Sequence, residues 1–154
     1  MTKLCCDVIQ TLDGKTLVTA ESLTGGGIGH ALTGVSGSSA VYKGGIISYT
    51  NQVKNQILGV PAQMLEQYGA VSAPVAKAMA EGARKCLLAD VAVSVTGLAG
   101  PGGDEYGNPV GTVFIGYADE KRTAVKQCLF AGDREQVRNQ TIEEALKLIL
   151  SYAK

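Results

Sequence analysis

One stretch of the sequence combines residue types that could perform nucleophilic chemistry or bind an anion. Ser22 and Thr24 supply hydroxyl groups, Glu21 supplies a carboxylate, and three glycines follow at residues 25–27. The apolar residues 16–20 predict a buried strand just before them, and ligand-binding groups in α/β proteins gather past the carboxyl ends of strands. Glycines let the backbone approach a ligand, and the free amides of a helix start attract anions. Ser22 therefore stands where a nucleophile would stand, although an ordinary glycine-rich turn explains the pattern equally well.

A serine nucleophile needs a base, and the sequence offers few choices for one. The single histidine, His30, follows Ser22 on the same expected helix, which argues against a local Ser-His-Asp triad. A neutral lysine is the remaining common base, provided that burial or nearby positive charge lowers its pKa. Lys54 lies one helical turn past the end of the second expected strand, near Tyr49 and Asn51, and is the best-placed lysine. By spacing alone, an exposed lysine on a helix surface remains the simpler explanation.

A third segment whose residues could contribute to a functional site follows another expected strand and begins with Thr96 and Gly97. We expect this segment, the Ser22 loop and residues 49–54 to converge at one end of the sheet. Two nucleotide-binding motifs are absent, because no lysine follows the glycines as in a P-loop and residues 25–30 lack the third glycine of the dinucleotide fingerprint. The Ser22 loop thus suits a phosphate better than a whole dinucleotide.

Length and composition define the class of protein and exclude several functions. The 154 residues can bury a core, and we expect one domain over residues 1–154. Lys plus Arg and Asp plus Glu number 14 each, so a net charge of zero leaves no electrostatic footprint for nucleic acid or an anionic membrane. No apolar run reaches the length of a membrane span and no signal pattern opens the chain, so we expect a cytoplasmic protein without a membrane partner.

The cysteines predict neither a disulfide framework nor a zinc site. Cys5, Cys6, Cys86 and Cys128 form no C-x-x-C pair, and only one histidine is present to join them. A structural zinc site needs several such ligands at short spacing. We therefore expect four reduced, mostly buried thiols and no bound metal.

Hydrophobic periodicity and turn residues predict alternating helices and strands. Thr50 or Asn51 could cap one helix, and Asp133 with a glutamine three residues later resembles a capping box. The order predicts an α/β fold: a single three-layer α/β/α domain with a mixed, mostly parallel sheet that ends in an antiparallel hairpin. The expected helices cover residues 3–12, a short segment around Ile28, 51–58, 61–69, 73–88 and 134–152, and the expected strands cover 16–20, 41–49, 91–96, 111–118 and 123–130.

Small residues predict two places where the backbone approaches a neighbour closely. Gly44 and Gly45 lie within the second expected strand and indicate a bulge or a close contact. The helix expected over residues 73–88 carries Ala76, Ala80 and Gly82, which favour tight packing on a sheet or on a partner subunit. We expect a homo-oligomer, a dimer or larger.

Seven short motifs occur in a fixed order along the chain and together carry a family resemblance. They are Ala20-Glu21-Ser22-x-Thr24-Gly25-Gly26, Gly37-Ser38-Ser39, Tyr49-x-Asn51-x-x-Lys54, Gly69-Ala70-Val71-Ser72, Thr96-Gly97-Leu98-Ala99-Gly100-Pro101, Gly111-Thr112-Val113 and Gly132-Asp133-Arg134. This set resembles the CinA C-terminal domain family, whose stand-alone members are PncC-type nicotinamide mononucleotide amidohydrolases. The likeness runs from about Leu17 to the last helix. Leu23 stands where many members have Cys and Leu98 where Ile is more usual, and neither change removes a polar group.

The resemblance implies a fold, an activity and a catalytic set. The family fold is a three-layer α/β/α domain, and its activity converts nicotinamide mononucleotide into nicotinate mononucleotide and ammonia, a reaction of NAD salvage that uses no metal or cofactor. By this likeness Ser22 is the nucleophile, Lys54 its base, and Tyr49 and Thr96 support the dyad and the reacting amide. A catalytically silent nucleotide-binding or regulatory module of the same fold is the alternative, and a structural partner domain is a third. Ammonia release separates the enzyme from the other two.

The resemblance also implies the groups that bind the mononucleotide. Arg134 corresponds to the arginine that binds the substrate, and Arg138 lies one turn further along as a second candidate. Backbone amides of the glycine-rich loops would stabilise the oxyanion, and loop amides with hydroxyl groups would hold the 5′-phosphate. The full expected binding set is Thr24, Gly25, Gly26, Gly37, Ser38, Gly97, Arg134 and Arg138.

Overall fold

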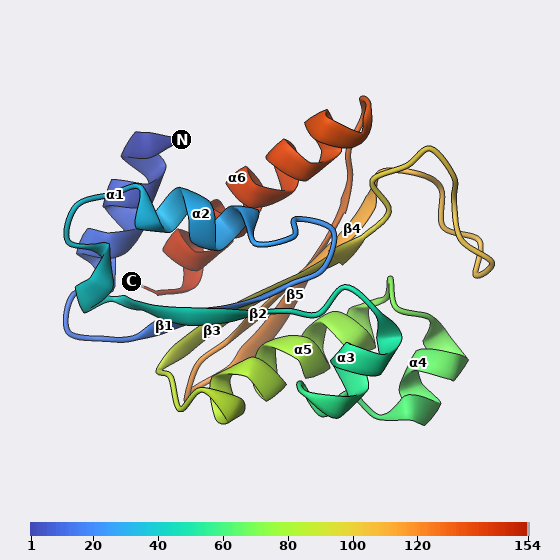
Figure 1. The fold of residues 1–154 in the computed structure, drawn as a ribbon, viewed down its shortest axis with the longest axis horizontal. Coiled ribbons are helices and arrows are strands. Elements are labelled where there is room, and N and C mark those ends of the chain that lie inside the picture. Colours follow the sequence, from blue (N-terminus) through green and yellow to red (C-terminus); the bar gives the residue numbers. More distant parts are fainter. Residues whose placement is uncertain (154) are drawn as a thin grey trace.

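The computed structural model describes residues 1–153 and has an α/β fold (Figure 1). Its helices are α1 (Thr2–Thr11), α2 (Gly27–Thr33), the 3-10 helix η1 (Ser38–Ala40), α3 (Asn51–Gln56), α4 (Ala62–Tyr68), α5 (Ala73–Cys86) and α6 (Arg134–Tyr152). Its strands are β1 (Leu17–Glu21), β2 (Tyr42–Ile47), β3 (Val91–Gly97), β4 (Thr112–Ala118) and β5 (Thr123–Leu129). The predicted elements all occur, with ends that differ from the prediction by one or a few residues.

The five strands form one mixed sheet in the order β2-β1-β3-β4-β5. Strand β1 pairs in parallel with both β2 and β3, whereas β4 is antiparallel to β3 and to β5. Four strands thus run in one direction and only β4 runs against them, as the late hairpin predicted. Because β1, β2 and β3 are parallel, the segments that follow them leave the sheet at the same edge.

Helices cover both faces of the sheet and make the predicted three layers. Helices α1, α2 and α6 lie on one face, and α3, α4 and α5 lie on the other (Figure 1). No helix within residues 1–153 combines the length and apolar character that a membrane crossing requires.

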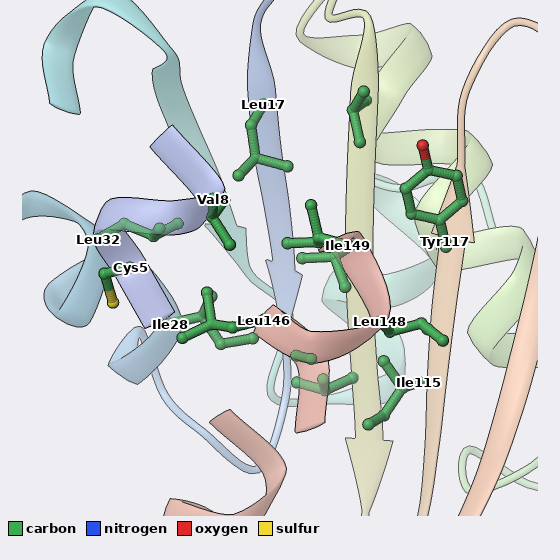
Figure 2. Close-up of a cluster of buried hydrophobic side chains, with 14 of the residues drawn as sticks. Cys5, Val8, Leu17, Ile28, Leu32, Ile115, Tyr117, Leu146, Leu148 and Ile149 are labelled. Carbon is green, nitrogen blue, oxygen red and sulfur yellow. The ribbon is translucent and has the colours of Figure 1, made fainter. Parts of the chain in front are cut away.

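The larger apolar core lies between the sheet and the α1–α2–α6 layer (Figure 2). Leu17 of β1 and Ile115 of β4 meet Ile28 of α2 and Leu146 and Ile149 of α6, and all five are fully buried. Burying each of these side chains contributes about 1.5–3 kcal/mol relative to its exposed state. This core anchors α2, whose first residues adjoin the Ser22 loop.

The second core lies between the sheet and α5, which contributes Val75, Met79 and Ala83 to it. The small residues of α5 also pack closely, as the sequence predicted. Ala76, Ala80 and Ala83 of α5 are fully buried. A Cβ atom on Gly82 would clash with the backbone of Leu58, just past the end of α3. The helix α5 therefore packs tightly against the segment that follows α3 as well as against the sheet.

The glycine pair in β2 and the caps of two helices occur as the sequence predicted. The register between β1 and β2 shifts beside Gly44, and a Cβ atom on Gly45 would clash with Thr19, so this glycine pair marks both a bulge and a close approach. Asp133 and Gln136 form the capping box of α6, with bonds of 2.8 and 2.9 Å. The Thr50 hydroxyl accepts from the Val53 amide and caps α3.

The expectation for the cysteines was partly wrong. All four thiols are free, but only Cys5 is buried. Cys6 and Cys128 are half-buried and Cys86 is exposed, because these residues lie at the margins of the helix and strand faces that form the core.

Candidate active site

The alternation of side chains along β1 places Glu21 and Ser22 on opposite faces of the sheet. Leu17 packs into the core on the α2 face, and the Glu21 carboxylate also bonds α2. Val18 and Ala20 pack into the core on the α5 face. Successive side chains of a strand point to opposite faces, so Ser22, which follows Glu21, faces the α3–α5 layer.

Lys54 reaches Ser22 from α3 on that same face. Its Nζ donates to the Ser22 hydroxyl oxygen at 2.9 Å and to the Ser48 carbonyl at 2.7 Å. A longer contact of 3.4 Å joins Nζ to the Tyr49 carbonyl. The Ser48 amide donates to the Glu21 carbonyl at 2.7 Å, which fastens the end of β2 to the end of β1. The two strand ends and α3 together set the separation of Ser22 and Lys54.

The environment of Lys54 lowers its basicity. The side chain is only 1% exposed, and burial lowers its pKa from 10.5 to about 8 because desolvation disfavours the charged ammonium. Within residues 1–153 no carboxylate oxygen lies within 4.0 Å of Nζ to oppose this effect. A useful fraction of Lys54 is therefore neutral near physiological pH, and a neutral amine can accept a proton.

Glu21 is buried beside the Ser22 loop, and both of its carboxylate oxygens accept hydrogen bonds from β1, this loop and α2. One carboxylate oxygen accepts from the Thr24 hydroxyl at 2.6 Å and from the Ile28 amide at 2.9 Å. The other accepts from the Gly29 amide at 3.0 Å and from the Thr19 hydroxyl at 3.2 Å. These donors compensate the buried charge, so the carboxylate braces the loop against α2 instead of pairing with Lys54.

The loop after Ser22 turns on two glycines and is held by an arginine from α6. Gly25 and Gly26 have φ values of 58° and 99°, a left-handed conformation that favours glycine. The Arg138 guanidinium donates to the Leu23 carbonyl at 2.9 Å and to the Thr24 carbonyl at 3.3 Å. Arg138 therefore contacts the loop backbone from α6 and fixes its path.

A pocket of about 390 Å³ opens beside Ser22 at the carboxyl edge of the parallel strands. Thr96, at the end of β3, contributes from the same face, and its hydroxyl donates to the Ala70 carbonyl at 2.8 Å. Arg134 reaches the pocket from the start of α6 and donates to the Gly100 carbonyl at 2.6 Å and to the Tyr49 hydroxyl at 3.1 Å. The pocket thus combines a serine, a lysine of lowered pKa and a guanidinium group.

Six of the predicted residues line this pocket together: Ser22, Tyr49, Lys54, Thr96, Gly97 and Arg134. The sequence reasoning did not assign a site role to the other lining residues, which are Leu23, Asn51, Ala70, Val71, Leu98, Ala99, Gly100 and Gly102. Most of these are apolar or glycine, and such residues carry no chemical signal in a sequence. Asn51 was predicted as a possible helix cap and as part of the Tyr49-x-Asn51-x-x-Lys54 motif, without a binding role of its own.

Four other predicted binding residues support the nucleophile loop and do not line the pocket. The Thr24 hydroxyl is used by Glu21, Gly25 and Gly26 form the turn, and Arg138 holds the loop carbonyls. Substrate binding by these four residues stays a prediction.

Gly37 and Ser38 lie at the amino ends of the parallel strands, whereas Ser22 lies at their carboxyl ends. The expectation that they join Ser22 is therefore not met within one chain. They precede β2, whereas Ser22 follows β1, and these two strands run in parallel. The six residues of β2 span about 20 Å at roughly 3.3 Å per residue. The length of one strand therefore separates this pair from the pocket.

Within residues 1–153, no three His, Cys, Asp or Glu side chains gather as a metal-binding group. The carboxylate nearest the nucleophile in sequence, Glu21, already accepts four hydrogen bonds.

Comparison with known sequences identifies relatives along almost the whole chain. The model of the CinA C-terminal domain family matches residues 2–153. A CinA-like protein of Geotalea daltonii is 52% identical over 133 residues, which cover 86% of this chain and 32% of that protein. A CinA-like protein of Geobacter sulfurreducens is 48% identical over 133 residues, with the same two coverages. The chain thus spans about a third of the length of these curated relatives.

Solved structures share the fold over nearly the full chain. A CinA superfamily protein from Escherichia coli has a TM-score of 0.95 at 38% identity, covering 97% of this chain and 88% of that one. The competence/damage inducible protein CihA from Agrobacterium tumefaciens has a TM-score of 0.96 at 36% identity, covering 99% and 95%. By the family match over residues 2–153 and by these relatives, the chain belongs to the CinA C-terminal domain family.

Proposed function

We propose that the chain is an amidohydrolase that cleaves the carboxamide of nicotinamide mononucleotide, yielding nicotinate mononucleotide and ammonia. The observation that carries the proposal is the 2.9 Å hydrogen bond between Lys54 Nζ and Ser22 Oγ in a pocket where burial lowers the pKa of Lys54 to about 8. A serine activated by a neutral lysine is a nucleophile suited to acyl transfer. Family membership supports the proposal, since stand-alone members of this family resemble such amidohydrolases.

The contacts of Lys54 suit the role of a base. A neutral amine has two N–H donors and one lone pair. The Ser48 and Tyr49 carbonyls can accept the two hydrogens, at 2.7 and 3.4 Å, which leaves the lone pair for the proton of the Ser22 hydroxyl. The same two carbonyls also hold the amine in place after it becomes charged.

The reaction then proceeds in two half-reactions. Lys54 takes the proton as Ser22 Oγ attacks the carboxamide carbon, and it returns the proton to the nitrogen as the C–N bond breaks and ammonia leaves. Water, deprotonated by the same lysine, attacks the acyl-serine, and the lysine returns that proton to Ser22 Oγ as the ester bond breaks and the carboxylate leaves. The Leu23 amide directly follows the nucleophile and donates to no acceptor within residues 1–153, so we assign it to the oxyanion.

The charge of the pocket supports an anionic substrate. Arg134 contributes a guanidinium group to the pocket lining. Within residues 1–153, no carboxylate oxygen lies within 4.0 Å of this group. We assign the 5′-phosphate to Arg134, since guanidinium groups bind phosphate oxygens through paired N–H donors. Residues such as Leu98 and Val71 would pack against the pyridine ring.

The proposal is tested by measuring ammonia release from nicotinamide mononucleotide by the purified chain. Ser22→Ala should lower kcat by about a thousandfold or more, because it removes the nucleophile. Ser151→Ala, an exposed serine at the far end of α6, is the matched control and should retain the wild-type rate. A wild-type chain that binds the mononucleotide without releasing ammonia would support the silent binding module instead.

The cytoplasmic location and the homo-oligomeric state stay predictions. Any activity or partner that the longer curated relatives have is likewise a prediction for this chain.

A further inference from the structure

The connection between β3 and β4, residues 98–111, leaves the sheet as a long excursion (yellow in Figure 1). Its two ends are joined at the sheet, where the Gly111 amide donates to the Leu98 carbonyl at 2.8 Å and the Leu98 amide donates to the Thr112 carbonyl at 2.9 Å. The excursion contains no helix or strand, so its remaining path depends on side-chain contacts.

Its distal part, residues 104–108, closes on itself around one carboxylate, and we call it the clasp. Asp104 accepts from the amides of Tyr106 and Asn108 at 3.0 and 2.9 Å and from the Asn108 side chain at 2.8 Å. The Asp104 amide donates back to the Asn108 carbonyl at 3.2 Å. These bonds make the clasp a compact unit.

The clasp is fastened to α4 and to the connection between α4 and α5. The Tyr106 hydroxyl donates to the Glu66 carbonyl at 2.7 Å, and the Asn108 side chain donates to the Val71 carbonyl at 3.0 Å. The Tyr106 ring lies against Gly69, where an added Cβ atom would stand 2.5 Å from a ring carbon. The Tyr106 ring can therefore pack here only because residue 69 has no side chain.

The near part of the excursion forms one wall of the Ser22 pocket. Leu98, Ala99, Gly100 and Gly102 all line the pocket. The Gly100 carbonyl also accepts the 2.6 Å hydrogen bond from Arg134. The clasp thus lies on the same segment as a pocket wall and as an acceptor that orients the guanidinium group.

We propose that Tyr106 and Asp104 are positioning residues that hold this wall, and through the Gly100 carbonyl the Arg134 side chain, in the geometry that binds the substrate phosphate. The assignment of the phosphate to Arg134 rests on the proposed function. Neither residue lines the pocket beside Ser22, so their effect falls on binding and leaves the Ser22–Lys54 pair in place.

The test compares Tyr106→Phe, which removes only the hydroxyl, with the control Tyr68→Phe in α4. The Tyr68 hydroxyl makes no hydrogen bond within residues 1–153 and lies outside the pocket. Loss of the Tyr106–Glu66 hydrogen bond is expected to raise KM for the mononucleotide about fivefold, with kcat changed less than about twofold. Asp104→Asn should act in the same direction. A fall in kcat with unchanged KM, or an equal effect of Tyr68→Phe, would overturn the proposal.

A double-mutant cycle tests whether the effect passes through Arg134. In an Arg134→Ala background, Tyr106→Phe should raise KM by less than about twofold, because the side chain that the wall orients is gone. A full fivefold effect in both backgrounds would show that Tyr106 acts on the substrate independently of Arg134 and would contradict the assignment.

Hydrogen exchange separates failure of the clasp from failure of the proposed function. Tyr106→Phe should increase amide exchange at Leu98, Ala99, Gly100 and Gly102, whereas Tyr68→Phe should not. A wild-type chain without ammonia release would refute the proposed function, and the exchange result would still decide whether the clasp holds the wall. Unchanged exchange at these amides in Tyr106→Phe would refute the clasp.

Discussion

Lys54 is the residue in which stability and chemistry oppose each other. Its ammonium group is desolvated without a carboxylate to compensate it, and the resulting pKa of about 8 is what a base working near neutral pH requires. Glu21 could have supplied a compensating charge, but its carboxylate is committed to four donors on the other face of β1. Glu21 and Lys54 lie on opposite faces of β1. The carboxylate therefore does not pair with the lysine, whose amine stays available to accept a proton.

The first prediction at this scale concerns the pH dependence of the rate. If neutral Lys54 is the base, kcat/KM should rise about tenfold per pH unit below an apparent pKa of about 8 and level off above it. Lys54→Arg keeps the charge but cannot accept a proton at these pH values, so kcat should fall about a thousandfold. The measurement is a profile of kcat/KM against pH from about 6 to about 10, on both sides of the expected pKa. Substantial turnover by Lys54→Arg would show that another group deprotonates Ser22.

The second prediction concerns the free energy of unfolding. Lys54→Met removes a buried charge at similar length and should raise the free energy of unfolding at pH 7 by about 1–3 kcal/mol, allowing for lost hydrogen bonds. Between pH 8 and 10.5 native Lys54 loses its proton while the unfolded chain keeps it, so wild-type stability gains on the variant as pH rises. Urea unfolding at pH 7 and pH 10 measures both differences. A variant equally stable at both pH values relative to wild type would exclude a lowered pKa for Lys54.

At the scale of elements, the short helix α3 depends on α5 for its position. Six residues are too few for a stable isolated helix, so tertiary packing must hold α3 and the lysine that it carries. Gly82 of α5 provides that packing, since it lies against the backbone of Leu58. A glycine of α5 thus lies against the segment that directly follows the helix carrying Lys54.

Gly82→Ala tests this dependence. In an unconstrained helix the change would stabilise by up to about 1 kcal/mol, whereas here the added methyl group must displace the Leu58 backbone at a cost of about 1–3 kcal/mol. We expect a lower urea midpoint together with a lower kcat, because the end of α3 moves. Lys85→Ala, an exposed change one turn along the same helix, should leave both quantities unchanged. A more stable Gly82→Ala variant would mean that Leu58 can move freely.

At the scale of the whole molecule, the two outer strands of the sheet carry exposed apolar side chains. Strands β2 and β5 are the outer strands, and Ile47 and Leu129 on them are 56% and 69% exposed. Native proteins usually cover or charge such edges, because unpaired strands recruit other chains. These edges favour the expected association with further copies of the chain.

Sedimentation velocity checks that expectation. The assembly should have a mass that is a multiple of 15.9 kDa, and Ile47→Lys should shift it toward smaller species if β2 is the covered edge. Leu129→Lys makes the same change at the other edge and distinguishes the two surfaces. A wild-type chain that sediments at 15.9 kDa at all concentrations would refute the homo-oligomer.

The amino-acid sequence by itself determined what depends on local order. Hydrophobic periodicity located the strands and helices, and Asp133 with Gln136 identified the start of α6, because caps and periodicity act within a few residues. Ser22, Tyr49 and Thr96 were predicted at strand ends and Lys54 one helical turn past a strand end, and parallel strands bring their carboxyl ends to one edge. Spacing alone still favoured an exposed Lys54, and its burial became visible only in the fold.

Tertiary structure decided everything that depends on which face or edge a residue occupies. Gly37 and Ser38 carry the same residue types as the nucleophile loop but precede their strand instead of following it, so they lie at the opposite edge. Arg134 lines the pocket, whereas Arg138 one turn later bonds the loop backbone, because one turn of α6 moves a side chain along the helix axis. The attachment of the pocket wall and the clasp could not be predicted, since Tyr106, Asn108 and Arg134 donate to backbone carbonyl groups, which every residue possesses. A backbone acceptor has no signature in a sequence, and only the folded chain determines which donor reaches it.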